Sequence, residues 1–389
     1  MPACTRAFTR GAANRISPHG RRVDTFAFII HPIDPKRDVS RKYPFLGRHL
    51  TERQIDFFST FFPPVYISEI EGITSQATGK EIKGWFIACP YTPRRMMELP
   101  ERTVYRKIIQ TGHLAERLGA QILGLGAFTS VVGDAGLTIA RALDLPVTTG
   151  DSYTVAIAVE ALRAAAGVMD IPIRAATAAV VGAGGSIGKV CAELLADEVA
   201  ELILIGRRPE PLEELRARLA GPGKARLRTS TSMDDLAQAQ LILTVTSAVH
   251  AVIHPEHLRP GSVVCDVARP RDVAARVAAS RDDILVIDGG MVDVPGPVDF
   301  HFNFGFPPGK AYACMAETMA LALEGRFEDY TLGKDISRTR VEESAAMASR
   351  HGFRLSGFRS FERAVSADQI ERVRERAHQA SARGAQGRR

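Results

Sequence analysis

The chain has 389 residues, of which 45% are hydrophobic and 24% charged, so it is long enough for the cores of two or three domains. Its formal net charge is +6, but the excess arginine lies at the two ends. Residues 1–22 hold five Arg and no acid, and residues 371–389 hold six Arg against two Glu. Because the ends account for the whole basic excess, we expect no nucleic-acid partner.

The cysteine spacing and the hydropathy of the chain argue against a disulfide-rich, a metal-binding or a membrane-spanning protein. The five cysteines are scattered, with neither Cys-x-x-Cys nor Cys/His metal spacing. We therefore expect no disulfide framework and no metal site, and a reducing, cytoplasmic compartment. No apolar run reaches the length of a membrane span, so we expect no transmembrane helix.

Alternating strand and helix patterns predict an α/β domain in the first half of the chain. A loop rich in Pro and Arg is expected after the first strand, which Pro32 ends. The predicted elements, in order, are a strand at 25–31, a hairpin from 64–70 and 81–88, a helix at 100–118, strands at 121–125 and 146–149, and a helix at 153–168.

A glycine-rich turn at residues 182–188 is the strongest motif in the chain. A β-branched and alanine run precedes it, and an amphipathic segment and a second apolar run follow it. In this strand–turn–helix–strand context a dinucleotide pyrophosphate rests on a helix N-terminus, and the spacing is G-x-x-G-x-x-G. The residues predicted to hold the cofactor there are Gly182, Gly185, Ser186, Ile187 and Gly188.

The residues that follow two strands indicate which nicotinamide cofactor is used and where it lies. An NAD site has an acid about 20 residues after the glycines, whereas Arg207 and Arg208 stand at that place here. A guanidinium pair suits a ribose 2′-phosphate, which favours NADPH; the alternative is a solvated start to the next helix. Thr246 and Ser247 are expected beside the nicotinamide or, alternatively, as caps of the next turn.

The α/β alternation continues to about residue 290. We expect a Rossmann-like, doubly wound, mostly parallel sheet with an N-terminal α/β substrate domain and C-terminal helices packing back. The expected divisions are a disordered basic tail at 1–23, a substrate domain at 24–168, an NADP-binding domain at 169–300, a C-terminal helical segment at 301–366 and a basic tail at 367–389.

Cys314 is the strongest candidate nucleophile. Two prolines and a glycine precede a helix predicted over 310–323, so Cys314 falls within about a turn of its N-terminus. There the helix dipole, with Lys310 nearby, would favour the thiolate, which is the form that attacks carbonyl carbons. Because Ala and Met flank Cys314 on an apolar helix, the alternative is a small core residue.

Several segments, in order along the chain, resemble the long-chain acyl-acyl-carrier-protein reductase family best known from cyanobacteria. Their joint order, over roughly residues 25–355, is more specific than any single motif. The segments are Phe26–Pro32, Arg94-Arg95, Arg106–Ile108, Leu125–Ser130, Thr148–Thr154, Gly182–Gly188, Tyr312–Thr318, Leu323–Arg326, Gly333–Ile336 and His351–Phe353.

The resemblance implies a mechanism and partners. The Cys314 thiolate would attack an acyl-carrier-protein or acyl-CoA thioester, NADPH would reduce the acyl-enzyme, and a long-chain aldehyde would leave, with peripheral membrane contact as a route of release. Thr154 falls in the family's cofactor segment, and Tyr153 stands where the family carries His, as a candidate catalytic residue. Basic residues expected to dock the carrier protein, or alternatively to form a solvated helix face, are Arg94, Arg95, Arg106 and Lys107.

Two phenylalanine clusters, at 57–62 and 302–306, are candidates for an acyl-chain tunnel or, alternatively, for plain core. Two rival functions are also open. A shikimate-type NADP-dependent dehydrogenase of a small hydroxy acid would leave Cys314 structural, and a non-catalytic NADP-binding protein would keep only the fold. The cysteine-bearing helix and the aromatic-rich first half favour the acyl-thioester reductase.

Overall fold

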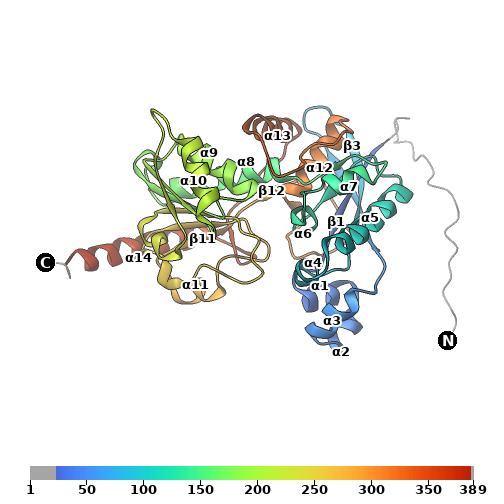
Figure 1. Ribbon diagram of the computed structural model, residues 1–389, viewed down its shortest axis with the longest axis horizontal. Helices are drawn as coiled ribbons and strands as arrows, with labels where there is room; N and C mark the ends of the chain where they lie inside the picture. Colours follow the sequence, from blue (N-terminus) through green and yellow to red (C-terminus); the bar gives the residue numbers. More distant parts are fainter. Residues whose placement is uncertain (1–22, 387–389) are drawn as a thin grey trace.

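The computed structural model describes residues 23–386, which form two open β-sheets, each covered by helices (Figure 1). The N-terminal tail expected at 1–23 lies outside the described residues, apart from its last position. Within the described part of the chain, every helix is too short or too polar to cross a membrane.

The first sheet has five strands and is parallel except at one edge. Its spatial order is β2 (Val65–Thr74), β3 (Glu81–Ala88), β1 (Asp24–Ile30), β4 (Leu123–Leu125) and β5 (Val147–Thr148). The strands β2 and β3 form the predicted antiparallel hairpin, and every other neighbouring pair is parallel. The central strand, β1, is buried along most of its length, as its apolar sequence predicts.

Three short helices replace the loop predicted after β1. They are α1 (Pro35–Lys42), α2 (Pro44–His49) and α3 (Glu52–Ser59). Asp34 caps the first by accepting a hydrogen bond from a backbone N–H, and Thr51 forms a capping box with Gln54 at the start of the third. No helix of the three exceeds eight residues, so none repeats its apolar pattern often enough to be recognised in the sequence.

Four further helices cover the first sheet, and the longest is the one predicted from residue 100. They are α4 (Pro93–Glu98), α5 (Glu101–Leu118), α6 (Phe128–Val131) and α7 (Leu137–Arg141). Gly119 ends α5 in the left-handed conformation, with a φ of 86°.

The second sheet has six strands and is entirely parallel. Its spatial order is β11 (Leu285–Asp288), β10 (Val263–Asp266), β9 (Leu241–Thr244), β6 (Thr177–Val181), β7 (Glu201–Ile205) and β8 (Arg226–Ser230). Numbered within the sheet, this is the order 3-2-1-4-5-6 of a dinucleotide-binding Rossmann fold. The expected fold class is therefore confirmed. The edge strand β8 has a mostly polar sequence, so it could not be recognised as a strand from its pattern.

Helices cover both faces of the second sheet, and α8 also joins it to the first (Figure 1). These helices are α8 (Asp151–Val168), α9 (Ser186–Ala196), α10 (Pro209–Leu219) and α11 (Ala275–Ser280). The apolar face of α8 packs against β9 and β10, so this helix lies between the two halves of the molecule.

The C-terminal segment returns the chain to the first sheet. Helix α12 (Ala313–Glu324) packs on β1 and β4, and α13 (Arg338–His351) packs on α12 and α8. The helix predicted from residue 310 begins three residues later, because Lys310–Tyr312 is strand β13, which pairs antiparallel with β12 (Met291–Asp293). The C-terminal helices therefore pack back as expected.

The last described residues form small strands and a helix. They are β14 (Arg354–Leu355), β15 (Arg359–Ser360), β16 (Arg363–Ala364) and α14 (Ala367–Gln386). The basic segment expected from residue 367, with its charged helix, contains α14, which buries Val373 and Ala377 against the second half of the molecule. These residues follow Ile370 at helical spacing, and this short apolar stripe holds the helix in place.

Candidate active site

The glycine turn and the end of β9 lie side by side where the strand order of the second sheet reverses. Gly182 has a φ of 85°, and a Cβ there would lie 2.5 Å from the carbonyl oxygen of Val245. A Cβ on Gly188 would lie 2.2 Å from the carbonyl oxygen of Gly182, so neither position accepts a side chain. Gly185 is less restricted, with 3.3 Å to the same oxygen. The turn has the closely packed, side-chain-free backbone that a dinucleotide pyrophosphate requires.

The arginine pair stands beside this turn. The backbone N–H of Gly182 donates to the carbonyl oxygen of Ile205 at 2.9 Å, which ties the turn to the end of β7. Arg207 and Arg208 follow that strand end and are exposed to solvent. Because the adenosine ribose of a dinucleotide lies beyond the second strand of a Rossmann fold, this placement fits a 2′-phosphate contact.

A cavity of about 160 Å³ lies between the carboxyl ends of the strands of the two sheets. Loops after β1, β4 and β5 line it from one sheet, and loops after β9, β10 and β11 line it from the other. Ligands bind beyond the carboxyl ends of parallel strands, so both sheets direct residues to one site. The predicted site residues that line this cavity are Thr154, Ile187, Thr246, Ser247 and Cys314.

Thr246 has a structural partner as well as a place in the cavity wall. Its backbone N–H donates to the Asp272 carboxylate at 2.8 Å, and its hydroxyl donates to the same carboxylate. That hydroxyl also accepts from the backbone N–H of Ala248 at 3.0 Å. Thr246 therefore caps the next turn, the alternative considered from the sequence, and it also lines the cavity.

Cys314 is the second residue of α12, as its predicted place near the helix start requires. Burial raises the pKa of its thiol to about 12, and the nearby Asp151 and Glu317 carboxyls add to that rise. The expected stabilisation of the thiolate is therefore wrong for the protein alone. Lys310 does not supply the expected positive charge, because its ammonium donates to Ser356 and Asp293.

Asp151 is a carboxyl group of this cavity that the pattern analysis missed. It is the first residue of α8, and burial raises its pKa to about 7, with the Glu317 carboxyl as the next cause. Gly150, just before it, has a φ of 75°, and a Cβ there would lie 2.3 Å from the Cα of Cys314. The turn after β5 therefore packs directly on the cysteine. The sequence signal for Asp151 was an acidic residue that directly follows a predicted strand and Gly150.

Glu317 holds the cysteine helix in position. Its buried carboxylate accepts hydrogen bonds from the hydroxyls of Thr148 (2.6 Å), Thr331 (2.8 Å) and Ser344 (3.1 Å). It also accepts from the backbone N–H of Tyr153 at 2.8 Å. These donors come from β5, α8, α13 and a loop, so one acid one turn after the cysteine joins four segments. A lone acid on an otherwise apolar helix was the sequence signal for it.

His31, which directly follows β1, lines the cavity. Its Nε2 accepts from the backbone N–H of Phe128 at 3.1 Å, and burial lowers its pKa to about 4. The ring is therefore neutral at pH 7, and since Nε2 is an acceptor, the ring proton lies on Nδ1. Among the described residues, this buried Nδ1 has no hydrogen-bond partner. His31 was not predicted as a site residue, because its only sequence signal is its place directly after a strand.

Tyr153 is not brought to the site. Its side chain is buried in the hydrophobic core that α12 forms with the first sheet, and it lines neither cavity described here. Its neighbour Thr154 faces the small cavity instead, because successive helical residues point about 100° apart. The structure therefore gives Tyr153 a packing role in place of the expected catalytic one.

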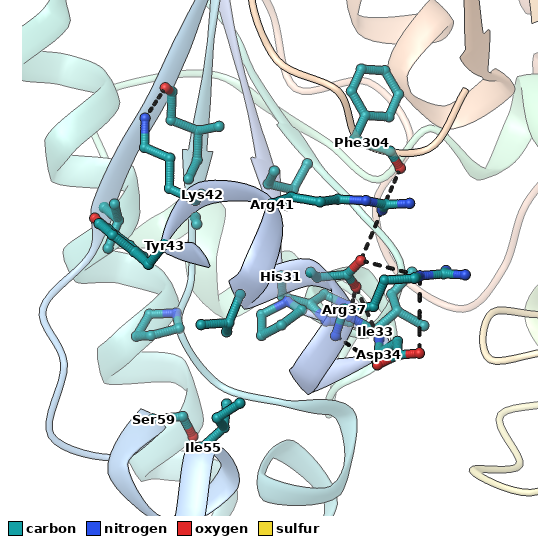
Figure 2. A pocket seen from close by; sticks show the side chains of 18 of the residues that line it. His31, Ile33, Asp34, Arg37, Arg41, Lys42, Tyr43, Ile55, Ser59 and Phe304 are labelled. Carbon is teal, nitrogen blue, oxygen red and sulfur yellow. Dashed lines mark hydrogen bonds and ion pairs between the residues drawn. The ribbon is translucent and has the colours of Figure 1, made fainter. Parts of the chain in front are cut away.

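A larger cavity of about 610 Å³, drawn in Figure 2, shares lining residues with the small one. Figure 2 shows on its wall Tyr43, which joins α1 to α2, and Ile55 of α3, together with His31 and Phe304. Both phenylalanine clusters of the sequence contribute to it, with Phe58 and Phe62 from the first and Phe302, Phe304 and Phe306 from the second. The residues that line both cavities are Ile30, His31, Ile33, Arg269, Tyr312 and Met315.

The predicted docking residues divide into two pairs. Arg95 forms an ion pair with Asp56 at 3.1 Å, and the Lys107 ammonium donates to the carbonyl oxygen of Phe62 at 2.8 Å. These two side chains fasten α3 and the residues after it to α4 and α5. Arg94 and Arg106 are exposed, and Arg94 pairs with Glu98 on its own helix. Of the four predicted docking residues, Arg94 and Arg106 are therefore the exposed ones, and docking itself stays a prediction.

Comparison with known families places the second sheet among the dehydrogenases. Residues 163–288 match the Shikimate / quinate 5-dehydrogenase family, and the match covers α8 to β11 only. Shikimate dehydrogenase (NADP(+)) of Stenotrophomonas maltophilia is 38% identical over 69 residues, which are 18% of this chain. The similarity is confined to the half that carries the glycine turn, and this half has a nicotinamide-cofactor-binding fold.

Two curated relatives match most of the chain. Aminotransferase PigE of Serratia sp. is 34% identical over 338 residues, and this chain spans 39% of its length. Long-chain acyl-[acyl-carrier-protein] reductase of Synechococcus elongatus is 32% identical over 345 residues, which are 84% of this chain and 98% of that one. Among solved structures, L-tryptophan dehydrogenase from Nostoc punctiforme aligns with a TM-score of 0.40 at 11% identity, too weakly for a functional argument. The chain belongs to the long-chain acyl-[acyl-carrier-protein] reductase family of oxidoreductases.

Proposed function

We propose that this protein is an NADPH-dependent reductase that converts a long-chain acyl thioester, bound to acyl-carrier-protein or coenzyme A, into the fatty aldehyde. One observation carries the proposal: the Cys314 thiol lies in a cavity that reaches the cofactor side of the second sheet and adjoins a large apolar cavity. A volume of about 610 Å³ lies within the roughly 300–1,000 Å³ typical of small-molecule sites. A reducing cytoplasm suits the reaction, since the four described cysteines are free thiols.

The residues of the second sheet fit the cofactor. The glycine turn and the N-terminus of α9 would hold its pyrophosphate, Arg207 and Arg208 its 2′-phosphate, and Thr246 and Ser247 its nicotinamide half. NADPH bound there supplies a hydride to the acyl group. Since Ile187, Thr246 and Ser247 line the small cavity with Cys314, cofactor and thiol would share one water-poor space.

Cys314 would act as the acyl acceptor. Its sulfur forms a bond to the thioester carbonyl carbon, and the bond from that carbon to the carrier thiol breaks. The thiol proton must leave Cys314 and reach the departing sulfur. Asp151 lines the same cavity, and its pKa of about 7 is matched to accepting and returning a proton near neutral pH.

His31 would stabilise the charge that develops on the carbonyl oxygen. This oxygen gains negative charge when the thiol adds and again when the acyl-enzyme is reduced. The Nδ1–H of a neutral imidazole can donate to it without losing its proton, since burial keeps the ring neutral. Collapse of the reduced adduct would release the aldehyde and the Cys314 thiolate, and one proton taken up from solvent would regenerate the thiol.

A substrate comparison tests the function. With NADPH, the purified chain is expected to form hexadecanal from palmitoyl-acyl-carrier-protein or from palmitoyl-CoA, measured by gas chromatography together with NADPH consumption. Shikimate with NADP⁺ is expected to give no turnover, because the shikimate-type similarity is confined to the cofactor half. Shikimate oxidation without aldehyde formation would reverse the assignment, and no turnover of any substrate would favour a non-catalytic NADP-binding protein.

The arginine pair predicts the cofactor preference. Replacing Arg207 and Arg208 together with alanine is expected to raise the KM for NADPH by roughly 10- to 100-fold, because hydrogen bonds to charged groups contribute about 1.5–3 kcal/mol. The KM for NADH is expected to stay within about twofold, since NADH has no 2′-phosphate. Arg216→Ala on α10, which also removes an exposed charge, is the control. Equal increases for both cofactors would contradict the 2′-phosphate contact.

A further inference from the structure

The three short helices after β1 carry an exposed aromatic surface. Among the described residues, eleven large apolar side chains are exposed, and six of them lie between residues 43 and 62. Phe45 and Phe61 are the most exposed, at 72% and 70%. The six residues of this aromatic surface are Tyr43, Phe45, Phe57, Phe58, Phe61 and Phe62. Clustered exposed apolar groups of this kind mark an interaction site.

The aromatic surface surrounds one wall of the large cavity. Tyr43, Phe58 and Phe62 belong both to the surface and to the cavity lining, together with Leu46 and Leu50 of the same helices. The ring centroids of Phe57 and Phe61 lie 5.6 Å apart, so the exposed rings contact one another as well. In Figure 1 the three helices form one tip of the molecule, below the first sheet. The apolar lining of the large cavity is therefore continuous with the aromatic surface at this tip.

The charge of the same segment is positive. Residues 35–62 contain six basic and three acidic residues, although the chain between its two basic ends is not basic. Lys36, Arg48 and Arg53 are exposed there. One of the three acids, Asp56, is buried against Thr92 and Arg95 and offers no charge to the surface. Exposed Phe with surrounding Lys and Arg is the composition of surfaces that enter the headgroup region of an anionic bilayer.

We propose that the α1–α3 tip docks on the surface of an anionic lipid bilayer and connects the large cavity to the membrane. The inference rests on the proposed function, because an uncharged long-chain aldehyde is poorly soluble in water and would pass from the cavity into lipid. A lipid surface fits better than an acidic carrier protein, because the segment exposes six aromatic side chains, which charge pairing with an acidic protein would not need.

Vesicle sedimentation tests the docking without any substrate, so its outcome is independent of the proposed reaction. The full chain is expected to sediment with vesicles of phosphatidylcholine and phosphatidylglycerol, and less with phosphatidylcholine alone. The double variant Phe45→Ser, Phe61→Ser is expected to bind at least about tenfold more weakly, because it removes the two largest exposed apolar areas. Neither residue lines the large or the small cavity, so thermal stability and NADPH-dependent turnover of a water-soluble short-chain thioester are expected to be unchanged.

Two controls separate the bilayer from other occupants. Leu137→Ser removes an exposed apolar side chain from α7, away from the tip, and is expected to leave vesicle binding unchanged. Arg48→Gln with Arg53→Gln is expected to reduce binding to anionic vesicles only. Wild-type protein that stays in the supernatant with both vesicle types would overturn the proposal. So would a wild-type dimer that the Phe45→Ser, Phe61→Ser variant dissociates, or a complex with acyl-carrier-protein that the same variant abolishes while vesicle binding persists.

Discussion

Cys314→Ala is expected to abolish both the acyl-enzyme and aldehyde formation. Wild-type protein incubated with palmitoyl-CoA or palmitoyl-acyl-carrier-protein, with NADPH withheld, should gain the mass of one palmitoyl group by intact mass spectrometry. The variant should gain none, and its turnover should fall by at least about 10³-fold, as for other enzymes that lose their nucleophile. The physical reason is that no other cysteine lines the cavity among the described residues.

A matched cysteine variant keeps this experiment specific. Cys89→Ala removes a thiol buried in the core of the first half, outside both cavities, and should retain the adduct and the turnover. The rate of acylation by the wild type should rise with pH through about 7, because Asp151 can accept the thiol proton only after it has lost its own. Aldehyde formation at the wild-type rate by Cys314→Ala would show that no covalent intermediate is needed.

His31→Gln is expected to lower kcat by about 10²–10³-fold with little change in KM, the effect of losing one donor to a developing oxyanion. The glutamine oxygen can take the place of Nε2 and accept from the backbone N–H of Phe128, so the local structure is kept. Nothing then replaces the Nδ1–H. Steady-state kinetics with NADPH and palmitoyl-CoA, together with a thermal melt of each protein, measures both effects.

His31→Asn is the complementary variant. Its amide nitrogen can take the place of Nδ1 and donate into the cavity, whereas the contact to Phe128 is lost. We therefore expect His31→Asn to be less stable than His31→Gln but more active. The reverse order, with activity following thermal stability, would mean that His31 only positions the start of α6. Since the ring is neutral above about pH 5, neither profile should contain a histidine titration.

The sequence predicted the features that depend on local constraints. The G-x-x-G-x-x-G turn could be recognised because its glycines are required by close backbone contacts. Gly188 lies against the carbonyl oxygen of Gly182 in the same turn, and Gly182 lies against the carbonyl oxygen of Val245 after the neighbouring strand β9. The parallel second sheet could be predicted from apolar strands that alternate with helices. The two phenylalanine clusters that line the large cavity could be recognised because each places several Phe residues close together in the sequence. Short helices such as α1–α3, and a polar edge strand such as β8, lacked the repeated apolar pattern that makes an element recognisable.

The tertiary structure decided which residues form the site. His31, Asp151 and Cys314 are separated by more than a hundred residues from one another, and no local pattern relates them. They meet because the two sheets turn the carboxyl ends of their parallel strands toward one cavity. The same arrangement places the partly buried Cys314 thiol beside two acids, and the pKa of this thiol is raised instead of lowered as the helix dipole predicts. Tyr153 and Thr154 are successive residues of α8, so their side chains point in different directions, Tyr153 into the hydrophobic core and Thr154 into the small cavity. Turns and strands depend on the conformations of neighbouring residues and can therefore be predicted from sequence. The burial, charge environment and direction of a side chain depend on contacts with residues far away in the sequence.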